Sequence, residues 1–212
     1  MGIGMKPEFG EDYIKRERES VIRQLNPHFL FNVLGALRIE AQTDADIAYD
    51  RIYDLSKYFR TVFLALEGRE NILFREEAAS AVSFLNLEKL RFGDAFTVYK
   101  DFGTEDFMLP PMSVLPLVDN AVRHGLLKGE RKGAITIRSR ELPAEYIVQV
   151  EDDGVGFDAA WFERMPGCDG PEAGGLRRVR YRVEHMAKGR LDVQSCPETG
   201  TVVTIRLPKT ER

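Results

Sequence analysis

The sequence predicts an α+β protein, in which a helical hairpin is followed by a two-layer sandwich of helices on one sheet. Apolar residues recur at a helical period over 27–67, whereas 134–140 and 145–151 alternate apolar and polar residues as strands do. Further helical and strand segments alternate along the second half. A chain of 212 residues is long enough for one large domain or two small ones.

The composition is that of an ordinary globular protein and excludes several classes. The net charge of -4 gives no overall attraction to nucleic acid, and no block of lysine and arginine interrupts the folded segments. No apolar run approaches the roughly 20 residues that span a bilayer, and the N-terminus lacks a signal-peptide pattern. We therefore expect a cytoplasmic chain. If the protein senses something outside a cell, we expect the part that senses it, and any contact with a membrane, to lie outside this chain. Cys168 and Cys196 have no metal-ligand spacing, which favours reduced thiols over a disulfide.

The first helices of the chain are separated by a proline. Residues 1–10 predict a flexible tail, and oppositely charged residues four apart predict a helix over 11–24. Pro27 interrupts this helix, because proline has no N–H and its ring clashes with the preceding turn. A new helix is predicted from there to about Ala41.

This restarted helix is predicted to have two distinct faces. His28 and Asn32 are one helical turn apart, so they share a face. That face lies roughly opposite an apolar stripe at a 3.6-residue period, which we expect to form the core. The stripe consists of Leu30, Leu34, Leu37 and Ala41. The imidazole is therefore predicted to point away from the core of its own helix.

A second amphipathic helix is predicted over 45–67, with Thr43 or Asp44 as its N-cap and Gly68 at its end. Its apolar side consists of Ile52, Leu55, Phe59, Val62, Phe63 and Leu66. Two such helices cannot bury both stripes alone, so we expect 11–69 to pair with a second copy as a four-helix bundle, which makes the protein a homodimer.

Residues 70–212 are predicted to form the second domain. Its helices are expected at 75–91, from Pro110-Pro111 to Leu126, and at 175–187. Its strands are expected at 95–102, 134–140, 145–151, 190–195 and 201–207. The stretch 154–173 has little periodicity and predicts a long mobile loop.

The first polar cluster of this domain lies on a helix, at 119–125. Asn120, Arg123 and His124 share one side of it and offer an amide oxygen and two cations. This set suits Mg²⁺ and phosphate, because the hard cation takes oxygen ligands and cations neutralise phosphate oxygens. A polar helix face with a locally satisfied histidine is the alternative.

Two further clusters are rich in glycine. Asp152 follows a strand, where a carboxylate accepts from an exocyclic amine, and Gly154 and Gly156 let backbone approach a ligand closely. Gly174 and Gly175 open a helix, where free N–H groups and the helix dipole attract an anion. Ordinary turns and helix starts also use these residues, so each cluster alone leaves the simpler reading open.

The order of the motifs is more specific than any one of them. The box Asn-Pro-His-Phe-Leu-Phe-Asn at 26–32 is followed by the Asn120 helix, Asp-Gly-x-Gly, the loop, Gly-Gly-Leu and Gly200-Thr201. This arrangement, over about 20–208, resembles the LytS-type sensor histidine kinases, in which such a box is joined to an ATPase domain of the Bergerat (GHKL) type.

The resemblance implies an ATP-dependent protein-histidine autokinase of a two-component system, with ATP and Mg²⁺ as cofactors and a response regulator as partner. His28 would be the phosphoacceptor, helped by Asn32 and Asp119, and Asn120 would bind Mg²⁺. Residues 157–173 would be the ATP lid. The nucleotide would contact Arg123, His124, Asp152, Gly154, Gly156, Gly174, Gly175, Leu176 and Thr201.

The chain departs from the family pattern at several positions. Asp119 replaces a usual glutamate, Ala173 a usual glycine and Leu115 a common glutamine. We expect the last two to weaken ATP binding or slow turnover. Pro116 stands where water-activating members of the wider ATPase group carry a glutamate. Ala173 and Leu115 leave open a decayed ATP-binding signalling module as an alternative. A mechanical ATPase of the chaperone or mismatch-repair type is the other alternative, but it would need the glutamate that Pro116 replaces and would not need the box at 26–32.

Overall fold

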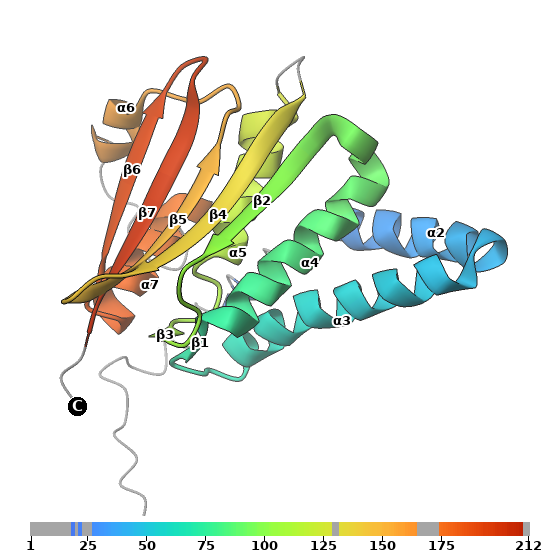
Figure 1. Cartoon of the computed structure of the whole chain (residues 1–212), viewed down its shortest axis with the longest axis horizontal. Helices are drawn as coiled ribbons and strands as arrows, with labels where there is room; N and C mark the ends of the chain where they lie inside the picture. The colour runs from blue at the N-terminus through green and yellow to red at the C-terminus, as the bar shows by residue number, and fades with distance from the viewer. Residues whose placement is uncertain (1–17, 20, 23–26, 129–131, 165–173, 210–212) are drawn as a thin grey trace, which may run out of the picture.

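Two helices of the hairpin project from the side of a sheet in the computed structural model, which describes residues 18–19, 21–22, 27–128, 132–164 and 174–209. Helix α2 (Pro27–Thr43) and helix α3 (Ala45–Leu66) meet at a turn that points away from the sheet (Figure 1). Helix α4 (Phe74–Phe92) packs along α3. None of the helices in the described ranges is both long and apolar enough to cross a membrane.

The predicted cap and end of the second hairpin helix are confirmed, whereas the first helix ends at Thr43, two residues later than predicted. The side chain of Asp44 accepts hydrogen bonds from the backbone N–H groups of Asp46 and Ile47, both at 3.1 Å, and so caps α3. Gly68 follows the helix with a φ of 80°, a conformation that glycine adopts without strain. The predicted tail at 1–10 and most of the predicted helix at 11–24 lie outside the described residues.

The predicted apolar faces of the hairpin are wrong in part. Helix α2 buries Phe29, Val33 and Leu37, whereas Leu34 is 53% exposed and Ala41 is exposed. The reason is that α2 packs against both α3 and α4, so its inner face is set by two neighbours rather than by its own leucine spacing. On α3, too, the buried face differs from the predicted one, and part of the predicted apolar stripe contacts solvent. Its buried residues are Ala48, Tyr58, Thr61 and Val62, and Ile52 and Phe63 are exposed.

The second half contains a five-stranded sheet in the order β2-β4-β5-β7-β6. Its strands are β2 (Phe96–Phe102), β4 (Gly133–Glu141), β5 (Glu145–Asp152), β6 (Arg190–Cys196) and β7 (Gly200–Pro208). β2 and β4 are parallel, and the other neighbours are antiparallel. Two short strands that the sequence did not predict, β1 (Ile72–Leu73) and β3 (Met108–Leu109), form a separate antiparallel pair.

Helices cover one face of this sheet and form the core with it (Figure 1). They are α4, α5 (Leu115–Asn120) and α7 (Gly175–Met186), and α5 continues into a π-helical turn at Ala121–Leu126. The predicted α+β fold of helices on one mixed sheet is therefore confirmed. The predicted loop at 154–173 is wrong in part, because α6 (Ala159–Arg164) lies within it, anchored by the buried Phe162. Residues 165–173 lie outside the described residues.

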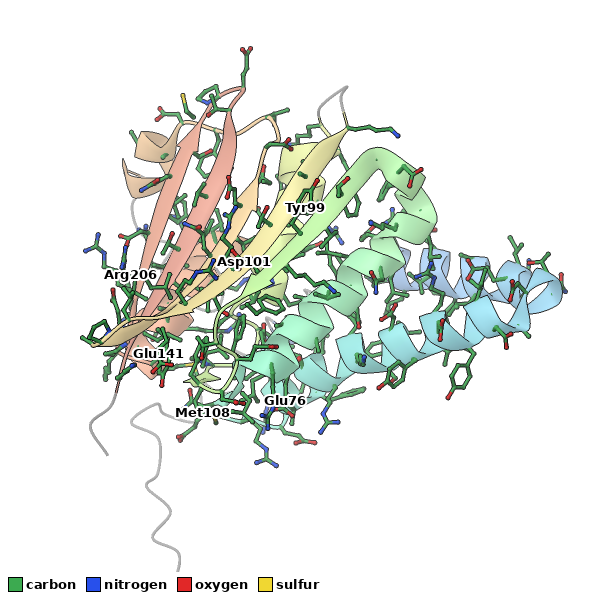
Figure 2. All side chains as sticks on the ribbon, viewed as in Figure 1. Glu76, Tyr99, Asp101, Met108, Glu141 and Arg206 are labelled. Atoms are coloured by element: carbon green, nitrogen blue, oxygen red, sulfur yellow. The ribbon has the colours of Figure 1, made fainter. Side chains whose placement is uncertain are left out.

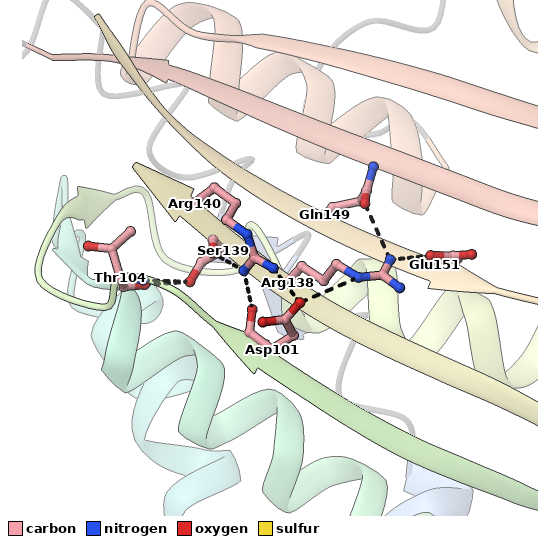
Figure 3. A network of polar contacts seen from close by, with 7 residues as sticks. All are labelled: Asp101, Thr104, Arg138, Ser139, Arg140, Gln149 and Glu151. Carbon is pink, nitrogen blue, oxygen red and sulfur yellow. Dashed lines mark hydrogen bonds and ion pairs between the residues drawn. The ribbon is translucent and has the colours of Figure 1, made fainter. Parts of the chain in front are cut away.

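The opposite face of the sheet carries charged side chains that pair with one another. Arg138 contacts Glu151, and its Nη1 lies 3.4 Å from the Gln149 side-chain oxygen (Figure 3). Arg140 donates to the backbone oxygen of Asp101 at 2.9 Å. Figure 2 labels Asp101 and, farther along the sheet, Arg206, which pairs with Glu145 at 2.7 Å. This face is solvated and its charges are paired, so the helical side of the sheet is the better candidate for a ligand site.

Candidate functional site

The histidine of the 26–32 box lies in the first turn of α2 and is exposed. The amide nitrogen of Asn32, one turn later, is 3.3 Å from Nδ1 and 3.4 Å from Nε2 of His28. The shared face that the i,i+4 spacing predicted is therefore confirmed. Asn32 holds the imidazole at the surface of the helix with a polar group that carries both a donor and an acceptor.

The residue after the histidine fixes this end of the hairpin. Phe29 is fully buried, and its ring centre is 5.4 Å from that of Tyr58 on α3 and 5.2 Å from that of Phe84 on α4. Ring pairs at such distances add to the stabilisation from area burial alone. The aromatic contact therefore attaches the first turn of α2, which carries His28, to both α3 and α4.

A buried carboxylate stands at the end of β5. Asp152 is 5% exposed, and its Oδ1 accepts a hydrogen bond from the Gly154 N–H at 3.0 Å. Burial raises the pKa of Asp152 to about 6, although that hydrogen bond lowers it. The neighbouring Asp153 turns to β4, where its Oδ1 accepts from the Ala134 N–H at 2.7 Å. Asp152 is thus a desolvated acceptor with spare capacity for one more donor.

The turn after Asp152 touches the end of the Asn120 helix without any side chain between them. The Val155 N–H donates to the Gly125 carbonyl at 3.1 Å. A Cβ on Gly125 would overlap the Asp152 carboxylate, and a Cβ on Gly154 would overlap the Gly125 backbone. Only glycine fits at both positions, so the two motifs form one continuous wall.

The last strand completes this wall. Thr201 on β7 pairs in register with Asp152 and is buried, and its hydroxyl lies 3.0 Å from that of Ser195. Ser195 also donates to the Gly200 carbonyl at 3.0 Å and accepts from the Phe157 N–H at 2.9 Å. Ser195 therefore connects the Asp152 wall to Phe157, the first residue of the predicted lid. Gly156 directly precedes Phe157 in the chain.

Asn120 ends α5 and is half-buried beside Asp119. Asp119 pairs with Arg123 one turn later. Burial raises the pKa of Asp119, whereas the charge and hydrogen bond of Arg123 lower it. His124 lies at the surface, where partial desolvation and the charge of Lys128 lower its pKa. The helix therefore presents an imidazole whose pKa is lowered and an arginine that is already paired with a carboxylate.

A second acid–arginine pair lies against this one. Glu88 of α4 is 1% exposed, and Arg91 donates to both of its carboxylate oxygens, at 3.1 and 2.8 Å. Burial raises the pKa of Glu88, while the charges of Arg91 and Arg123 lower it. Tyr58 of the hairpin is buried near these groups, and burial together with the charge of Asp119 raises its pKa. Tyr58 from the hairpin, the Glu88–Arg91 pair from α4 and the Asp119–Arg123 pair of the Asn120 helix thus lie in one cluster.

The start of α7 lies at the end of the predicted lid. Gly174 is its N-cap, exposed and without a side-chain cap, so the first N–H groups of the helix have no side-chain partner from the cap. Gly175 begins the helix, and Leu176 is buried in the core. Packing of α7 on α5 brings this helix start to the same side of the sheet as Asn120.

The chain matches two family models and several sensor kinases. One model, described as histidine kinase, matches residues 17–96, and another, described as histidine kinase-, DNA gyrase B- and HSP90-like ATPase, matches residues 113–211. Sensor histidine kinase YpdA of Escherichia coli (strain K12) is 32% identical over 92% of this chain and 34% of its own length. Sensor protein LytS of Streptococcus agalactiae is 28% identical over 78% of this chain and 28% of its own length.

The chain belongs to the LytS-type sensor histidine kinases. It spans about a third of the length of the sensor kinases YpdA and LytS. Among solved structures, the Acinetobacter baumannii histidine kinase AdeS covers 93% of this chain and 94% of its own length, at 16% identity and a TM-score of 0.51. This likeness supports the histidine kinase fold alone.

The structure brings most of the predicted nucleotide residues of this histidine kinase to one side of the sheet. Asp152, Gly154 and Thr201 adjoin directly, and Gly125 joins them to the helix of Asn120, Arg123 and His124. Gly174, Gly175 and Leu176 come from α7, while His28 and Asn32 come from the hairpin. Their individual roles stay predictions.

Sequence reasoning missed residues that shape the histidine kinase site without carrying obvious chemistry. Gly125 follows His124 directly, so its position next to the motif was the available signal. Ser195 and Tyr58 stand in ordinary strand and helix patterns and gave no signal. Leu115, one of the departures from the family pattern, is 3% exposed and belongs to the core. Ala173 lies outside the described residues.

Proposed function

We propose that this chain is the ATP-dependent autokinase part of a two-component system, which phosphorylates His28 and passes the phosphoryl group to an aspartate of a response regulator. One observation carries the proposal: the buried Asp152 carboxylate, walled by glycine backbone, lies in the same chain as an exposed histidine held by Asn32. The proposed parts are a dimerising hairpin at 11–69 and an ATP-binding domain at 70–212.

The wall around Asp152 suits an adenine ring. A carboxylate that accepts one backbone N–H has room for the exocyclic amine of the base, and burial favours a partner that replaces lost water. Glycine at 125 and 154 lets the end of the Asn120 helix pack directly on the turn after β5, so backbone closes this side of the Asp152 carboxylate. Thr201, in register with Asp152, offers a hydroxyl on the same side.

Asn120 and the start of α7 suit the phosphates and a Mg²⁺ ion. Magnesium in kinase sites is bound by one or two protein oxygens together with substrate phosphates, so a single half-buried amide oxygen on Asn120 fits this role. The uncapped N–H groups that follow Gly174 suit phosphate oxygens. When bound, Mg²⁺ supplies charge neutralisation on the phosphates. Arg91 pairs with Glu88, and Arg123 pairs with Asp119. Arg123 is therefore held beside the Asn120 helix rather than extended into solvent.

His28 has the chemistry of the acceptor. The lone pair of one ring nitrogen attacks the γ-phosphorus, the bond to the bridging oxygen breaks, and ADP leaves with those electrons. The proton of the ring is then released from the other nitrogen. A rotated Asn32 amide presents its oxygen to that N–H and thereby fixes which nitrogen carries the lone pair.

The exposed apolar residues of the hairpin support a homodimer. Of the twelve large apolar side chains that are exposed in the described ranges, eight lie on α2 and α3. They are Phe31, Leu34, Ile39, Ile47, Tyr49, Ile52, Tyr53 and Phe63. An apolar surface of this kind indicates a protein contact, and a second copy completes a four-helix bundle.

Incubation with γ-labelled ATP and Mg²⁺ tests the proposal. We expect label on the protein that is lost in acid, kept in alkali and absent from His28→Gln. Transfer of that label to an aspartate of a candidate response regulator tests the second step. Nucleotide binding without label would instead support the decayed signalling module, and free phosphate without a phosphoprotein would support a mechanical ATPase.

A further inference from the structure

A carboxylate outside the proposed site is buried completely among backbone N–H groups. Glu77 of α4 is 0% exposed. Its Oε2 accepts from the Met112 N–H at 3.0 Å, and its Oε1 accepts from the N–H groups of Val114 and Leu115 at 2.9 and 3.0 Å. A charge buried in this way costs free energy unless several partners satisfy it, so the arrangement holds the segment 112–115 in one place.

That segment is the start of the helix that ends at Asn120. Val114 is the N-cap of α5 and has no side chain that can cap it. Glu77 supplies the missing acceptor from 37 residues earlier in the chain, and a negative charge at this end also matches the helix dipole. Glu77 therefore fixes the beginning of the helix whose last residue is the proposed Mg²⁺ ligand.

The helix that begins at the predicted phosphate site reaches the same segment from the other side. Arg182 of α7 is 2% exposed, and its Nη1 donates to the Met112 carbonyl at 2.8 Å. Burial raises the pKa of Glu77, while its backbone hydrogen bonds and the charge of Arg182 lower it. Met112 has a φ of 62°, which only a firmly held non-glycine residue adopts.

The two contacts relate the phosphate ends of two helices. Asn120 lies five residues beyond Leu115, or about 7.5 Å along α5. Gly175 lies seven residues before Arg182, or about 10.5 Å along α7. Because both helices are attached to Met112 and its neighbours, movement of one relative to the other requires breaking a buried hydrogen bond.

We propose that Glu77 and Arg182 are positioning residues, which set the distance between Asn120 and the start of α7 and so act on the triphosphate half of the bound nucleotide. This inference rests on the proposed function and deepens it. Asp152, which faces the adenine half, lies at the end of β5, where its own turn and the register with Thr201 of β7 hold it. The Val155 bond ties Gly125 to this turn rather than to the 112–115 segment. Loosening the 112–115 segment should therefore weaken contacts to phosphate and leave contacts to adenine unchanged.

The test measures binding of Mg·ATP and of adenosine by calorimetry to the full chain and to Glu77→Gln, Arg182→Met and Arg182→Lys. We expect Glu77→Gln and Arg182→Met to lose at least tenfold in affinity for Mg·ATP and less than twofold for adenosine, and Arg182→Lys to recover part of the loss. Glu76→Gln is the matched control: it makes the same change one residue away, on a carboxylate that caps α4 at Leu73 and is labelled at the start of that helix in Figure 2. The ratio of the Mg·ATP affinity to the adenosine affinity in Glu76→Gln should equal the ratio in the unmodified chain.

Several outcomes would overturn the inference. Equal losses for Mg·ATP and adenosine would mean that the substitutions disturb the fold in general, and an unchanged ratio would mean that the two residues do not position the phosphate site. If circular dichroism shows that Glu77→Gln does not fold, the ratio of Mg·ATP affinity to adenosine affinity in the two Arg182 variants tests the inference instead. An unmodified chain that binds no Mg·ATP would instead overturn the proposed function, and the inference with it.

Discussion

The side-chain amide nitrogen of Asn32 lies 3.3 Å from Nδ1 of His28 and 3.4 Å from its Nε2. The residue after the histidine is Phe29, which is buried and carries no acid. The polar partner of the ring therefore comes from one helical turn away, through a neutral amide. The amide orients the imidazole by hydrogen bonding alone.

Replacing this amide should slow phosphorylation of His28 without affecting the nucleotide. We expect Asn32→Ala to lower the rate of autophosphorylation by about ten- to a hundredfold, because an unoriented ring spends less time aligned with the γ-phosphate. The KM for ATP should stay the same, since the amide is on the hairpin. Rates from the acid-labile label over a series of ATP concentrations separate the two quantities. A raised KM with an unchanged maximal rate would contradict this role.

Asp152→Asn should abolish nucleotide binding and yet not destabilise the fold at alkaline pH. The pKa of Asp152 is raised to about 6, above the value for an unfolded aspartate, so folding is favoured when the group is protonated. The contribution is fully present below about pH 4 and is lost as pH rises through 6. At pH 8 the neutral asparagine avoids this loss, which is at most about 3 kcal/mol.

Thermal melts at pH 5 and pH 8, together with ATP titrations, check this prediction. The melting temperature of Asp152→Asn should equal or exceed that of the unmodified chain at pH 8, with a smaller difference at pH 5. The ATP affinity of the unmodified chain should itself fall as pH drops below about 6, because protonation removes the charged acceptor. Full ATP binding by the variant would sink the adenine assignment.

The parts of the molecule that the sequence predicted depend on local spacing. The i,i+4 relationship of His28 and Asn32 and the alternation in β4 and β5 are fixed within one or two turns of chain, so they were predicted correctly. The buried face of α2 depends instead on α3 and α4, and the prediction for Leu34 was wrong. The partners of Arg182 and Glu77 lie 70 and up to 38 residues away, a separation that no local pattern reports.

Gly125→Ala, which adds one methyl group at the end of the Asn120 helix, should weaken nucleotide binding. The added Cβ would overlap the Asp152 carboxylate, so the helix end and the β5 turn must separate. We expect at least a tenfold loss of ATP affinity and a destabilisation of about 1–3 kcal/mol. Calorimetry and chemical unfolding measure both. Gly35→Ala, on the exposed surface of α2 where a Cβ meets nothing within 4 Å, is the control: it should leave the ATP affinity unchanged and, as alanine favours a helix more than glycine does, stabilise the fold by up to about 1 kcal/mol.

If the hairpin forms a homodimer, a charged substitution on its exposed apolar surface should lower the molar mass of the particle in solution. Leu34→Glu places a carboxylate on the exposed apolar surface of α2, where a second copy would bury it without a partner. We expect this variant to elute as a monomer in size-exclusion chromatography with light scattering, at concentrations where the unmodified chain is a dimer. Leu142→Glu makes the same change at an exposed leucine beyond the end of β4 and should leave the dimer intact. A monomeric unmodified chain would remove the basis of the bundle.

Asp54 joins the hairpin to the nucleotide side of the molecule. Its two carboxylate oxygens accept from the Ser83 hydroxyl at 2.8 Å and from the Asn86 amide at 3.1 Å, both on α4. Asp54→Ala leaves these two donors unpaired in a partly buried contact, which should destabilise the fold by about 1–3 kcal/mol. Because α3 then loses one of its polar attachments to α4, while the bond from the Ser80 hydroxyl to the Tyr58 carbonyl at 3.2 Å remains, the position of His28 relative to the nucleotide should become less defined.

The expected signature of Asp54→Ala is a fall of at least threefold in the rate of His28 phosphorylation with an unchanged dissociation constant for ATP. Asp50→Ala is the matched control, because Asp50 lies one turn earlier on the same helix and is exposed. It should alter neither quantity. If phosphorylation by Asp54→Ala is as fast as by Asp50→Ala, the hairpin reaches the nucleotide without this attachment, and the packing of Phe29 on Tyr58 and Phe84 is then sufficient to place the histidine.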